Sequence, residues 1–303
     1  MGRSEQQITD TLLMIRPAQF AYNPETAASN IFQKTIGKGT IVHSQALKEF
    51  DLLVKKLREH KIYVIVLQDS ESPLTPDSIF PNNWISFHGK EIILYPMLAE
   101  NRRLERRSDW IEIIKSSFGI SEVKDFSNEE LKGKFLEGTG SLVLDRKNKI
   151  AYANISSRTN FELARHWCAE MNFELISFNS STRDGKEIYH TNVLMAIGER
   201  VAILCSEVIR DENDRKKVHI KLSQQHHVVE ISEEQMNHFA GNMLLVKNRD
   251  REKFWVMSQQ AFDCLSSSQN ETLKLDGEFL LSDLKTIEAA GGGSARCMIA
   301  EIL

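Results

Sequence analysis

One pattern returns about every 50 residues along this chain, and it limits the folds that the chain can adopt. A polar or glycine-rich turn leads into an apolar strand, which is followed by a charged turn, a second strand and a helix. Because each unit can bury its apolar face only against its neighbours, such repetition indicates one architecture built from similar parts. The five turn-and-strand segments are Phe80–Phe87, Glu137–Leu144, His190–Ala196, Ala240–Val246 and Gly293–Ile299.

Second strands and helices follow the first strands at regular positions. Some of the helical segments carry apolar residues at a spacing of three to four, as an amphipathic helix does. The expected second strands are Glu91–Tyr95, Lys149–Asn154, Arg200–Cys205 and Lys253–Ser258, and the expected helices include Arg103–Ser117 and Asn160–Met171.

The fifth unit ends after its first strand, and the other end of the chain offers the missing half. Thr11–Pro17 reads as a strand and Thr26–Lys34 as the helix after it. We therefore predict an α/β fold: a five-bladed, pseudo-symmetric α/β propeller closed by pairing of the N- and C-terminal strands. No linker rich in Pro, Gly or Ser divides the chain, so residues 1–303 are expected to form a single domain. The alternative is an accidental similarity among α/β units.

Composition excludes several classes of protein. A formal net charge of −4 argues against a nucleic-acid binder that works by neutralising phosphates. No apolar run approaches the ~18 residues that a membrane span needs, and Met1–Gln7 lacks the apolar core of a signal peptide. The four cysteines, Cys168, Cys205, Cys264 and Cys297, are far apart in sequence. Free thiols in a reducing cytoplasm are the simplest expectation.

The C-terminal segment carries the candidate nucleophile. Three glycines and a serine, from Gly291 to Ser294, predict a loop whose backbone approaches another group closely. This loop delivers Cys297 to the start of the apolar stretch Met298–Leu303, which has the length of a strand. A thiol at such a junction suits chemistry, while the alternative is a buried structural cysteine.

In a ring, the first strands gather near the axis, so their leading loops should converge on one central pocket. The equivalent positions are Asn83, Glu137, His190, Asn242 and Cys297. His190 is the best of nine histidines as a base or proton shuttle for the thiol. Glu137 is expected to orient and charge it, or to accept a hydrogen bond from the substrate.

Other polar residues have weaker claims. Asp77 and Asp184 each begin a turn that a local side-chain cap explains equally well. The His226–His227 pair has no third metal ligand spaced nearby, so a solvated loop is favoured and neither metal nor cofactor is expected. A Cys, a His and carboxylates together indicate covalent catalysis at a carbon electrophile, and a thiol protease fits that set equally well.

With these residues in view, the chain resembles the guanidino-group modifying enzymes: arginine deiminases, dimethylarginine hydrolases and amidinotransferases, which share the five-bladed propeller called the pentein fold. The likeness covers nearly the whole chain and is closest to a bacterial branch that includes citrulline-utilising hydrolases. It implies that Cys297, His190 and Glu137 are catalytic, that Asp77 binds substrate, that Arg158 grips the substrate α-carboxylate, and that Arg107 is a looser match to a second such arginine. The motifs are Gly291–Met298, Glu137–Gly140, His190–Asn192, Asp77–Phe80, Ser157–Asn160 and Arg106–Asp109.

Two departures from the family pattern bear on the substrate. Asn83 and Asn192 stand where deiminases resembling this chain hold the guanidinium with carboxylates. A cation in a partly dry pocket needs negative partners, whereas a neutral ureido group offers an acceptor and donors that an amide can meet. We therefore expect hydrolysis of citrulline to ornithine, ammonia and carbon dioxide.

Other functions remain open at this point. The site also suits arginine or methylarginine deimination, or amidinotransfer to a second amine. The same architecture hosts a ribosome-binding initiation factor, so a pentein-fold binding protein is the non-enzymatic alternative. The expected partner is a small amino-acid substrate, with neither nucleic acid nor membrane, and the sequence predicts nothing about oligomeric state.

Overall fold

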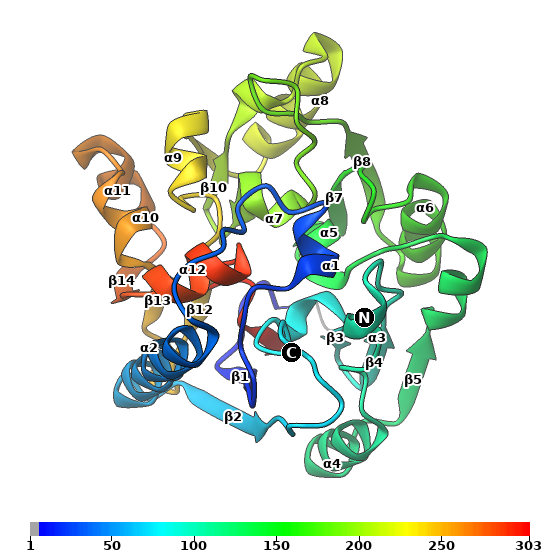
Figure 1. Cartoon of the computed structure of the whole chain (residues 1–303). Coiled ribbons are helices and arrows are strands. Elements are labelled where there is room, and N and C mark those ends of the chain that lie inside the picture. Colours follow the sequence, from blue (N-terminus) through cyan, green and yellow to red (C-terminus); the bar gives the residue numbers. More distant parts are fainter. Residues whose placement is uncertain (1–5) are drawn as a thin grey trace.

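A ring of five small sheets organises the chain (Figure 1). The computed structural model describes residues 6–303, so most of the N-terminal stretch Met1–Gln7, considered above as a signal peptide, lies outside the described residues. Within 6–303, each sheet has three strands, and the middle strand pairs antiparallel with the first and parallel with the third. The five-unit α/β architecture expected from the repeats is therefore confirmed.

The third strand of each sheet was not expected from the sequence. The strands, from first to third in each sheet, are β15 (Ala300–Ile302), β1 (Thr11–Arg16) and β2 (Tyr63–Gln68); β3 (Ile85–His88), β4 (Glu91–Leu94) and β5 (Glu122–Asp125); β6 (Leu142–Asp145), β7 (Ile150–Asn154) and β8 (Glu174–Phe178); β9 (Met195–Ile197), β10 (Val201–Leu204) and β11 (His227–Glu230); and β12 (Leu244–Lys247), β13 (Lys253–Ser258) and β14 (Glu278–Ser282).

The two ends of the chain close the ring. Strand β15 lies antiparallel to β1, with Thr11 opposite Ile302 and Leu13 opposite Ala300. The N-terminal strand is thus the middle strand of a sheet whose first strand comes from the C-terminus, near the centre of the molecule in Figure 1. This pairing confirms the expected closure.

Helices provide the crossovers that parallel strand pairs require. Each lies between the second and third strands of its unit, and Figure 1 shows α2, α4, α6, α8 and α11 at the rim. The crossover segments contain α1 (Pro24–Ala27) and α2 (Gly39–Glu59); α3 (Glu100–Arg103) and α4 (Ser108–Phe118); α6 (Phe161–Met171); η3 (Ser206–Val208) and α8 (Glu212–Ser223); and α10 (Gln259–Asp263) and α11 (Ser267–Leu273).

Short helical segments lead from one unit to the next. They are η1 (Pro81–Asn83), η2 (Ser127–Lys132), α5 (Gly138–Ser141), α7 (Thr191–Leu194), α9 (Glu233–Asn237) and α12 (Lys285–Gly291). The first strands are consequently shorter than predicted, because a helical turn takes up the beginning of each expected strand in the second, third and fourth sheets. These turns point toward the ring axis and position the site.

Helix predictions were mixed. For α6 the sequence signal was clear: Asn160 caps the first turn by accepting from the Leu163 amide, and Asn172 ends the helix in the left-handed conformation. The prediction for Thr26–Lys34 was wrong, since the chain forms only α1 there and continues as turns. The expected helix Arg103–Ser117 is broken after α3, and a new helix, α4, begins after Arg107.

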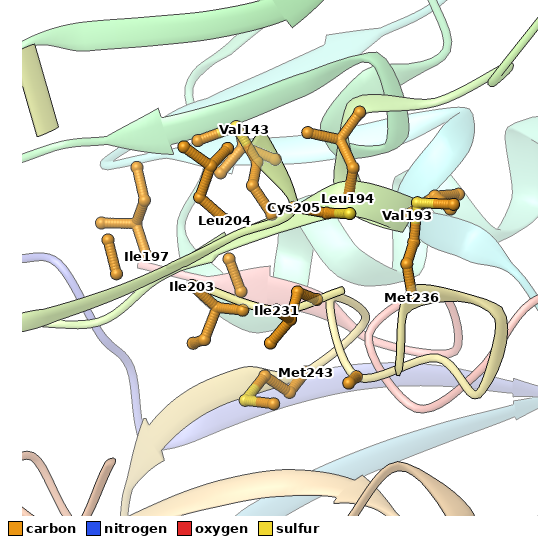
Figure 2. Packing of buried hydrophobic residues seen from close by; sticks show 14 of the residues in the cluster. Val143, Val193, Leu194, Ile197, Ile203, Leu204, Cys205, Ile231, Met236 and Met243 are labelled. Carbon is orange, nitrogen blue, oxygen red and sulfur yellow. The ribbon is translucent and has the colours of Figure 1, made fainter. Parts of the chain in front are cut away.

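Apolar side chains from neighbouring units pack together between the sheets. Figure 2 shows one such cluster, in which Val143, Leu194, Leu204 and Met243 come from separate strands and turns. Strand β7 is buried along its whole length, whereas the outer strand β8 begins at an exposed residue and then alternates between half-buried and buried positions. Among residues 6–303, no helix is both long and apolar enough to cross a membrane.

The contact between neighbouring units is tight enough to test with a single methyl group. A Cβ atom at Gly241 would lie 2.3 Å from the carbonyl oxygen of Val193 in the preceding unit. We expect Gly241→Ala to lower the free energy of unfolding by about 1–3 kcal/mol, because backbone must shift to make room. Gly39→Ala, where nothing lies within 4 Å of the added atom, is the control and should change stability by less than about 0.5 kcal/mol in urea denaturation. Equal effects of the two changes would contradict this packing account.

Candidate active site

The glycine loop before Cys297 owes its composition to close packing. A Cβ atom at Gly291 would meet the Phe80 ring at 2.7 Å, and one at Gly293 would meet the same ring at 3.0 Å. Gly292 has φ +64°, a conformation that side chains rarely adopt. The loop then turns so that the Cys297 amide donates to the Ser294 carbonyl at 3.0 Å. Cys297 is thereby fixed just before β15.

Two amides hold the sulfur of Cys297. Asn242 Nδ2 lies 3.3 Å from Sγ and also donates to the Asn192 carbonyl at 2.9 Å, and Asn192 Nδ2 lies 3.5 Å from Sγ. The Asn242 Oδ1 atom, 3.6 Å away, accepts from the thiol. The cysteine is only 4% exposed. Its surroundings are therefore polar on one side and closed to bulk water.

His190 is oriented by Glu137. Their Nε2 and Oε2 atoms are 2.9 Å apart, and both side chains are buried. An ionised carboxylate can only accept, so Nε2 carries the proton and Nδ1 of the neutral ring is left with a lone pair. A Cβ atom at Gly140 would lie 2.7 Å from that Nδ1 and 2.5 Å from Asn83 Nδ2, so the missing side chain leaves space between them.

Electrostatics keep the resting site mostly uncharged at the reacting atoms. Burial raises the pKa of the Cys297 thiol, and the hydrogen bond with Asn242 offsets only part of this. Burial lowers the pKa of His190 to about 4, against the opposing effect of Glu137. Burial alone would raise the pKa of Glu137, but Arg158 and His190 outweigh it and lower that pKa to about 2. Near neutral pH the thiol and imidazole are therefore neutral and Glu137 is ionised.

Cys297 and His190 line one small cavity at the ring axis, together with several residues predicted for the site. Its volume is about 10 Å³, which is room for one water molecule. The lining consists of Thr26, Asn30, Asp77, Phe80, Asn83, Arg102, Arg158, Tyr189, His190, Gly291, Gly292, Gly293 and Cys297. The predicted residues Asp77, Asn83 and Arg158 thus meet the thiol and imidazole, with Glu137, Asn192 and Asn242 directly behind them.

The contributing positions are not equivalent, contrary to expectation. Glu137 and His190 each stand immediately before a helical turn, α5 and α7, whereas Asn83 is the last residue of η1. Asn192 lies within α7. The leading turns do converge on the axis. The residue that reaches it stands before the turn in two units, Glu137 and His190, and at the end of the turn in another, Asn83.

Residues 23–30 cover the cavity. Asn23 and Thr26 each donate to Asp77 Oδ2 at 2.8 Å, and Asn30 Nδ2 donates to the Gly291 and Gly292 carbonyls at 3.3 Å. The same segment lines a surface depression of about 830 Å³ through Ala28 and Ser29. It therefore separates the cavity from solvent, and a substrate must displace it to enter.

Arg158 connects the covering segment, residues 23–30, to Glu137 beside His190. Its guanidinium donates to Ser29 Oγ at 2.7 Å, to the Thr26 carbonyl at 2.8 Å and to Glu137 Oε2 at 3.4 Å. It also stacks over the Tyr189 ring at 4.6 Å. Burial of a cation beside Glu137 explains the low pKa of that carboxylate.

The structure does not bring Arg107 to the site. Arg107 occupies the N-cap position of α4, and its side chain forms an ion pair with Asp109 at 2.7 Å and stacks on Trp110, outside the cavity lining. Asp184 likewise lies on an exposed turn beside Lys186. The cavity is lined by Arg102, from the same stretch as Arg107, together with Arg158.

Sequence reasoning missed both Arg102 and Tyr189. Tyr189 immediately precedes His190 and donates its hydroxyl to the Gly292 carbonyl at 2.7 Å. Arg102 belongs to a run of four arginines within six residues, and nothing in the run's composition says which one faces inward. Which of the four arginines faces the cavity depends on where the chain breaks between α3 and α4.

The described chain contains no group of three or more His, Cys, Asp or Glu side chains placed to hold a metal ion. The polar groups at the axis instead form a thiol, an imidazole, two carboxylates and several amides in one enclosed space. That set can attack a trigonal carbon, move a proton and hold an amino acid.

The chain matches one known protein family over nearly its whole length. The model of the family described as eukaryotic N,N dimethylarginine dimethylhydrolase matches residues 16–303. No curated protein matches the chain.

Several solved structures are similar. The substrate-bound N-terminal domain of ArgZ, an arginine dihydrolase from the ornithine–ammonia cycle in cyanobacteria, has 15% identity over 96% of this chain and 97% of that one, with a TM-score of 0.73. AgrE in complex with L-arginine has 16% identity and a TM-score of 0.73, over 98% of this chain but 40% of that one. A dimethylarginine dimethylaminohydrolase adduct with S-methyl-L-thiocitrulline has 14% identity and a TM-score of 0.67, over 98% and 100%. This chain spans 41% of full-length ArgZ. At these identities the likeness establishes the fold.

The low pKa of His190 predicts a pH-dependent stability. The folded pKa of about 4 lies below the ordinary 6.5, so between these values the unfolded chain binds a proton that the folded chain does not. Stability from the neutral ring is complete above pH 6.5 and falls as the pH drops toward 4. From pH 7 to pH 5, wild type should lose about 2 kcal/mol more unfolding free energy than His190→Gln in urea titrations. The half-exposed His219 provides the control, and His219→Gln should behave as wild type. A wild-type loss no larger than that of His190→Gln would contradict the assignment.

Proposed function

The chain belongs to the N,N-dimethylarginine dimethylhydrolase family, and on that premise we propose that it hydrolyses the ureido group of citrulline to ornithine, ammonia and carbon dioxide. It is a cysteine-dependent hydrolase of the deiminase and amidinotransferase superfamily, acting on non-peptide C–N bonds. Family membership favours an enzyme over a pentein-fold binding protein or a thiol protease. The four free cysteines suit a reducing cytoplasm, which we propose as its location.

The orientation of Asn83 carries the choice of substrate. Arg102 Nη1 lies 2.7 Å from Asn83 Oδ1, and a guanidinium can only donate, so the amide oxygen must face Arg102. The Nδ2 group is then the end that faces the cavity, and it has no partner among residues 6–303. A buried donor of this kind is complemented by an acceptor. A ureido carbonyl supplies one, whereas a guanidinium presents only N–H groups.

Besides the Asn83 donor, two buried acceptor atoms bear on the choice of substrate. Asp77 Oδ1 and Asn192 Oδ1 both lack partners within the described chain. The ureido nitrogen donors match Asp77 Oδ1 in the cavity lining, so one neutral group meets the orphaned atoms of both Asn83 and Asp77, while Asn192 lies behind that lining. Leaving such atoms unmet costs about 1–3 kcal/mol each, which gives the match its energetic weight.

The proposed reaction uses the neutral resting state. His190 Nδ1 takes the proton of the Cys297 thiol as sulfur attacks the ureido carbon, and the tetrahedral intermediate forms with its oxygen toward Asn83. The imidazolium, stabilised by Glu137, then protonates the departing nitrogen. One carbon–nitrogen bond breaks, its amine (ammonia or ornithine) leaves, and a thiocarbamate remains on sulfur. His190 next removes a proton from water, which attacks the thiocarbamate carbon. The carbon–sulfur bond then breaks, the imidazolium returns the proton to sulfur, and the released carbamic acid loses carbon dioxide to give the second amine.

Arg158 is proposed to bind the α-carboxylate of the substrate. Its bonds to Thr26 and Ser29 come from the covering segment, so they are released when that segment moves away. A carboxylate oxygen is a better acceptor for a guanidinium than a carbonyl or hydroxyl. Substrate binding and opening of the cavity are therefore linked through this residue.

Arginine or a methylarginine is the second candidate substrate. Asp77 and Glu137 provide negative charge near the cavity, and the similar structures include L-arginine and S-methyl-L-thiocitrulline complexes. Amidinotransfer differs only in whether an amine or water resolves the adduct.

Loss of the nucleophile tests the covalent route. Cys297→Ser should reduce citrulline and arginine turnover by about 10³-fold or more, because a serine hydroxyl is a far weaker nucleophile beside a neutral imidazole. Cys264→Ser, outside the cavity, serves as the control and should retain activity. Ammonia release and ornithine formation are measured for citrulline, arginine, methylarginines and agmatine. Faster turnover of arginine than of citrulline would reverse the order of substrates, and activity of Cys297→Ser would exclude the covalent intermediate.

Exchanging the amide at position 83 tests substrate choice. Asn83→Asp replaces the inward donor with an acceptor, so the ratio of kcat/KM for citrulline to that for arginine should fall about tenfold or more. Asn82→Asp is the matched control, because Asn82 donates to Thr139 and does not line the cavity. Its ratio should stay within about twofold of wild type. An unchanged ratio in Asn83→Asp would remove the basis for preferring citrulline.

A further inference from the structure

A buried carboxylate ties the two ends of the glycine loop together. Glu288 lies in α12, ahead of the glycines, and is 2% exposed. Its Oε1 atom accepts from Ser294 Oγ at 2.6 Å, and its Oε2 atom accepts from the side-chain amide of Gln260. Ser294 follows the last glycine and is fully buried. The bond between Glu288 and Ser294 therefore spans the glycines from one side of the loop to the other.

Helix α12 is capped at both ends without the Glu288 side chain. At its N-terminus, the buried carboxylate of Glu49, from α2, accepts from the Thr286 and Ile287 amides at 3.0 Å. At its C-terminus, the Gly292 amide donates to the backbone carbonyl of Glu288 at 2.9 Å. Burial raises the pKa of the Glu288 carboxyl group, because enclosing its charge is unfavourable. Since α12 does not need this charge, its place is explained by the loop that follows.

The glycines leave the loop conformationally free unless other groups hold it. In the closed arrangement Asn30, from the covering segment, donates to the Gly291 and Gly292 carbonyls at 3.3 Å. Those bonds are lost when the segment moves to admit a substrate. Glu288 and Ser294 both lie outside the segment, so their bond can persist in the open form.

From Ser294 onward the chain forms a compact turn. The Cys297, Met298 and Ile299 amides each donate to the carbonyl three residues earlier, at 3.0, 3.2 and 3.3 Å. Ser294 provides the first of these carbonyls, so a shift of Ser294 moves the turn and the thiol with it. Glu288 is outside the cavity lining, so it acts on the site through this turn.

From these contacts we infer that Glu288 is a positioning residue for the Cys297 thiol. Its bond to Ser294 holds the glycine loop and, through the turn, keeps the sulfur beside Asn242 and Asn192 while the cavity is open. Such placement matters because an error of about 1 Å at a reacting atom can cost about 100-fold in rate. The inference rests on the proposed role of Cys297 as the nucleophile.

Two variants break the bond from its two sides. Glu288→Met removes the acceptor at nearly constant volume, and Ser294→Ala removes the donor while leaving the carboxylate, which guards against a folding defect. Glu288→Gln is the conservative variant, since its amide oxygen still accepts from the Ser294 hydroxyl. Glu49→Met is the matched control, because Glu49 is the buried carboxylate at the other end of α12 and bonds to Thr286 and Ile287.

Loss of the bond should lower the rate of the chemical step rather than the affinity for substrate. For whichever of citrulline and arginine wild type turns over, we expect kcat to fall about tenfold in Glu288→Met and in Ser294→Ala, with KM within about twofold of wild type. Both changes together should cost no more than either alone, because they remove one interaction. Glu288→Gln should keep kcat within about threefold of wild type.

The control separates positioning from stability. Glu49→Met should lower the urea midpoint of unfolding and leave kcat within about twofold of wild type. An equal fall of kcat in Glu49→Met and Glu288→Met would overturn the inference, as would an unchanged kcat in both Glu288→Met and Ser294→Ala.

A structural readout separates this inference from the proposed function. If wild type turns over neither compound, the proposed function fails. Crystal structures then decide the inference in an Asn30→Ala background, which removes the bonds of the covering segment to the loop. The Cys297 sulfur lies 3.3 Å from Asn242 Nδ2 in wild type. A displacement of this sulfur by more than about 0.5 Å on adding Ser294→Ala supports the positioning role, and a smaller shift overturns it.

Discussion

Pairing of the first and last strands is the contact on which the whole site depends. Strand β15 provides only three residues to the sheet that it shares with β1. Cys297 lies just before this strand, so the pairing places the thiol at the ring axis. His190 and Glu137 come from the opposite half of the ring and reach the same axis through their own turns. Without this closure the thiol would not reach the imidazole and the carboxylate.

Burial of charge is the second organising feature. Glu137, Asp77, Arg158, Arg102 and Glu105 are all nearly inaccessible to solvent. Charges in such a place are tolerated only when they face partners of opposite sign and when hydrogen bonds meet their remaining atoms. The pairs Glu137–Arg158 and Arg102–Glu105 satisfy this, while Asp77, whose pKa burial raises, relies on donors from the cover.

The ring and its closure could be predicted from the sequence because the buried first and second strands repeat an apolar signature. The third strands could not. Strand β5 reads Glu-Val-Lys-Asp and β11 reads His-Val-Val-Glu, short stretches at the rim with exposed ends and a weak apolar signal. The helical turns were missed for a similar reason, since Gly138–Ser141 has poor helix formers and folds by tertiary contact.

The site was predicted in part. Cys297 and His190 stood out because polar or small residues lead directly into apolar strands. Arg107 was misplaced because local sequence does not reveal where a crossover breaks into two helices. The sequence around Tyr189 and Glu105 has no pattern that indicates a place in the site. Tyr189 is fixed by its hydrogen bond to Gly292, far along the chain, and Glu105 is buried only because of the fold.

The hydrogen bonds that close the cavity have a consequence for any measured affinity. Thr26 and Ser29 bind Arg158 in the closed arrangement, so only molecules in which these bonds are broken can receive a ligand. The observed dissociation constant is then the intrinsic one divided by the fraction that is open. A high dissociation constant for an amino acid would therefore reflect the stability of the closed covering segment as well as the contacts in the cavity. Weakening the bonds of Thr26 and Ser29 to Arg158 would lower that constant without adding any contact to the ligand.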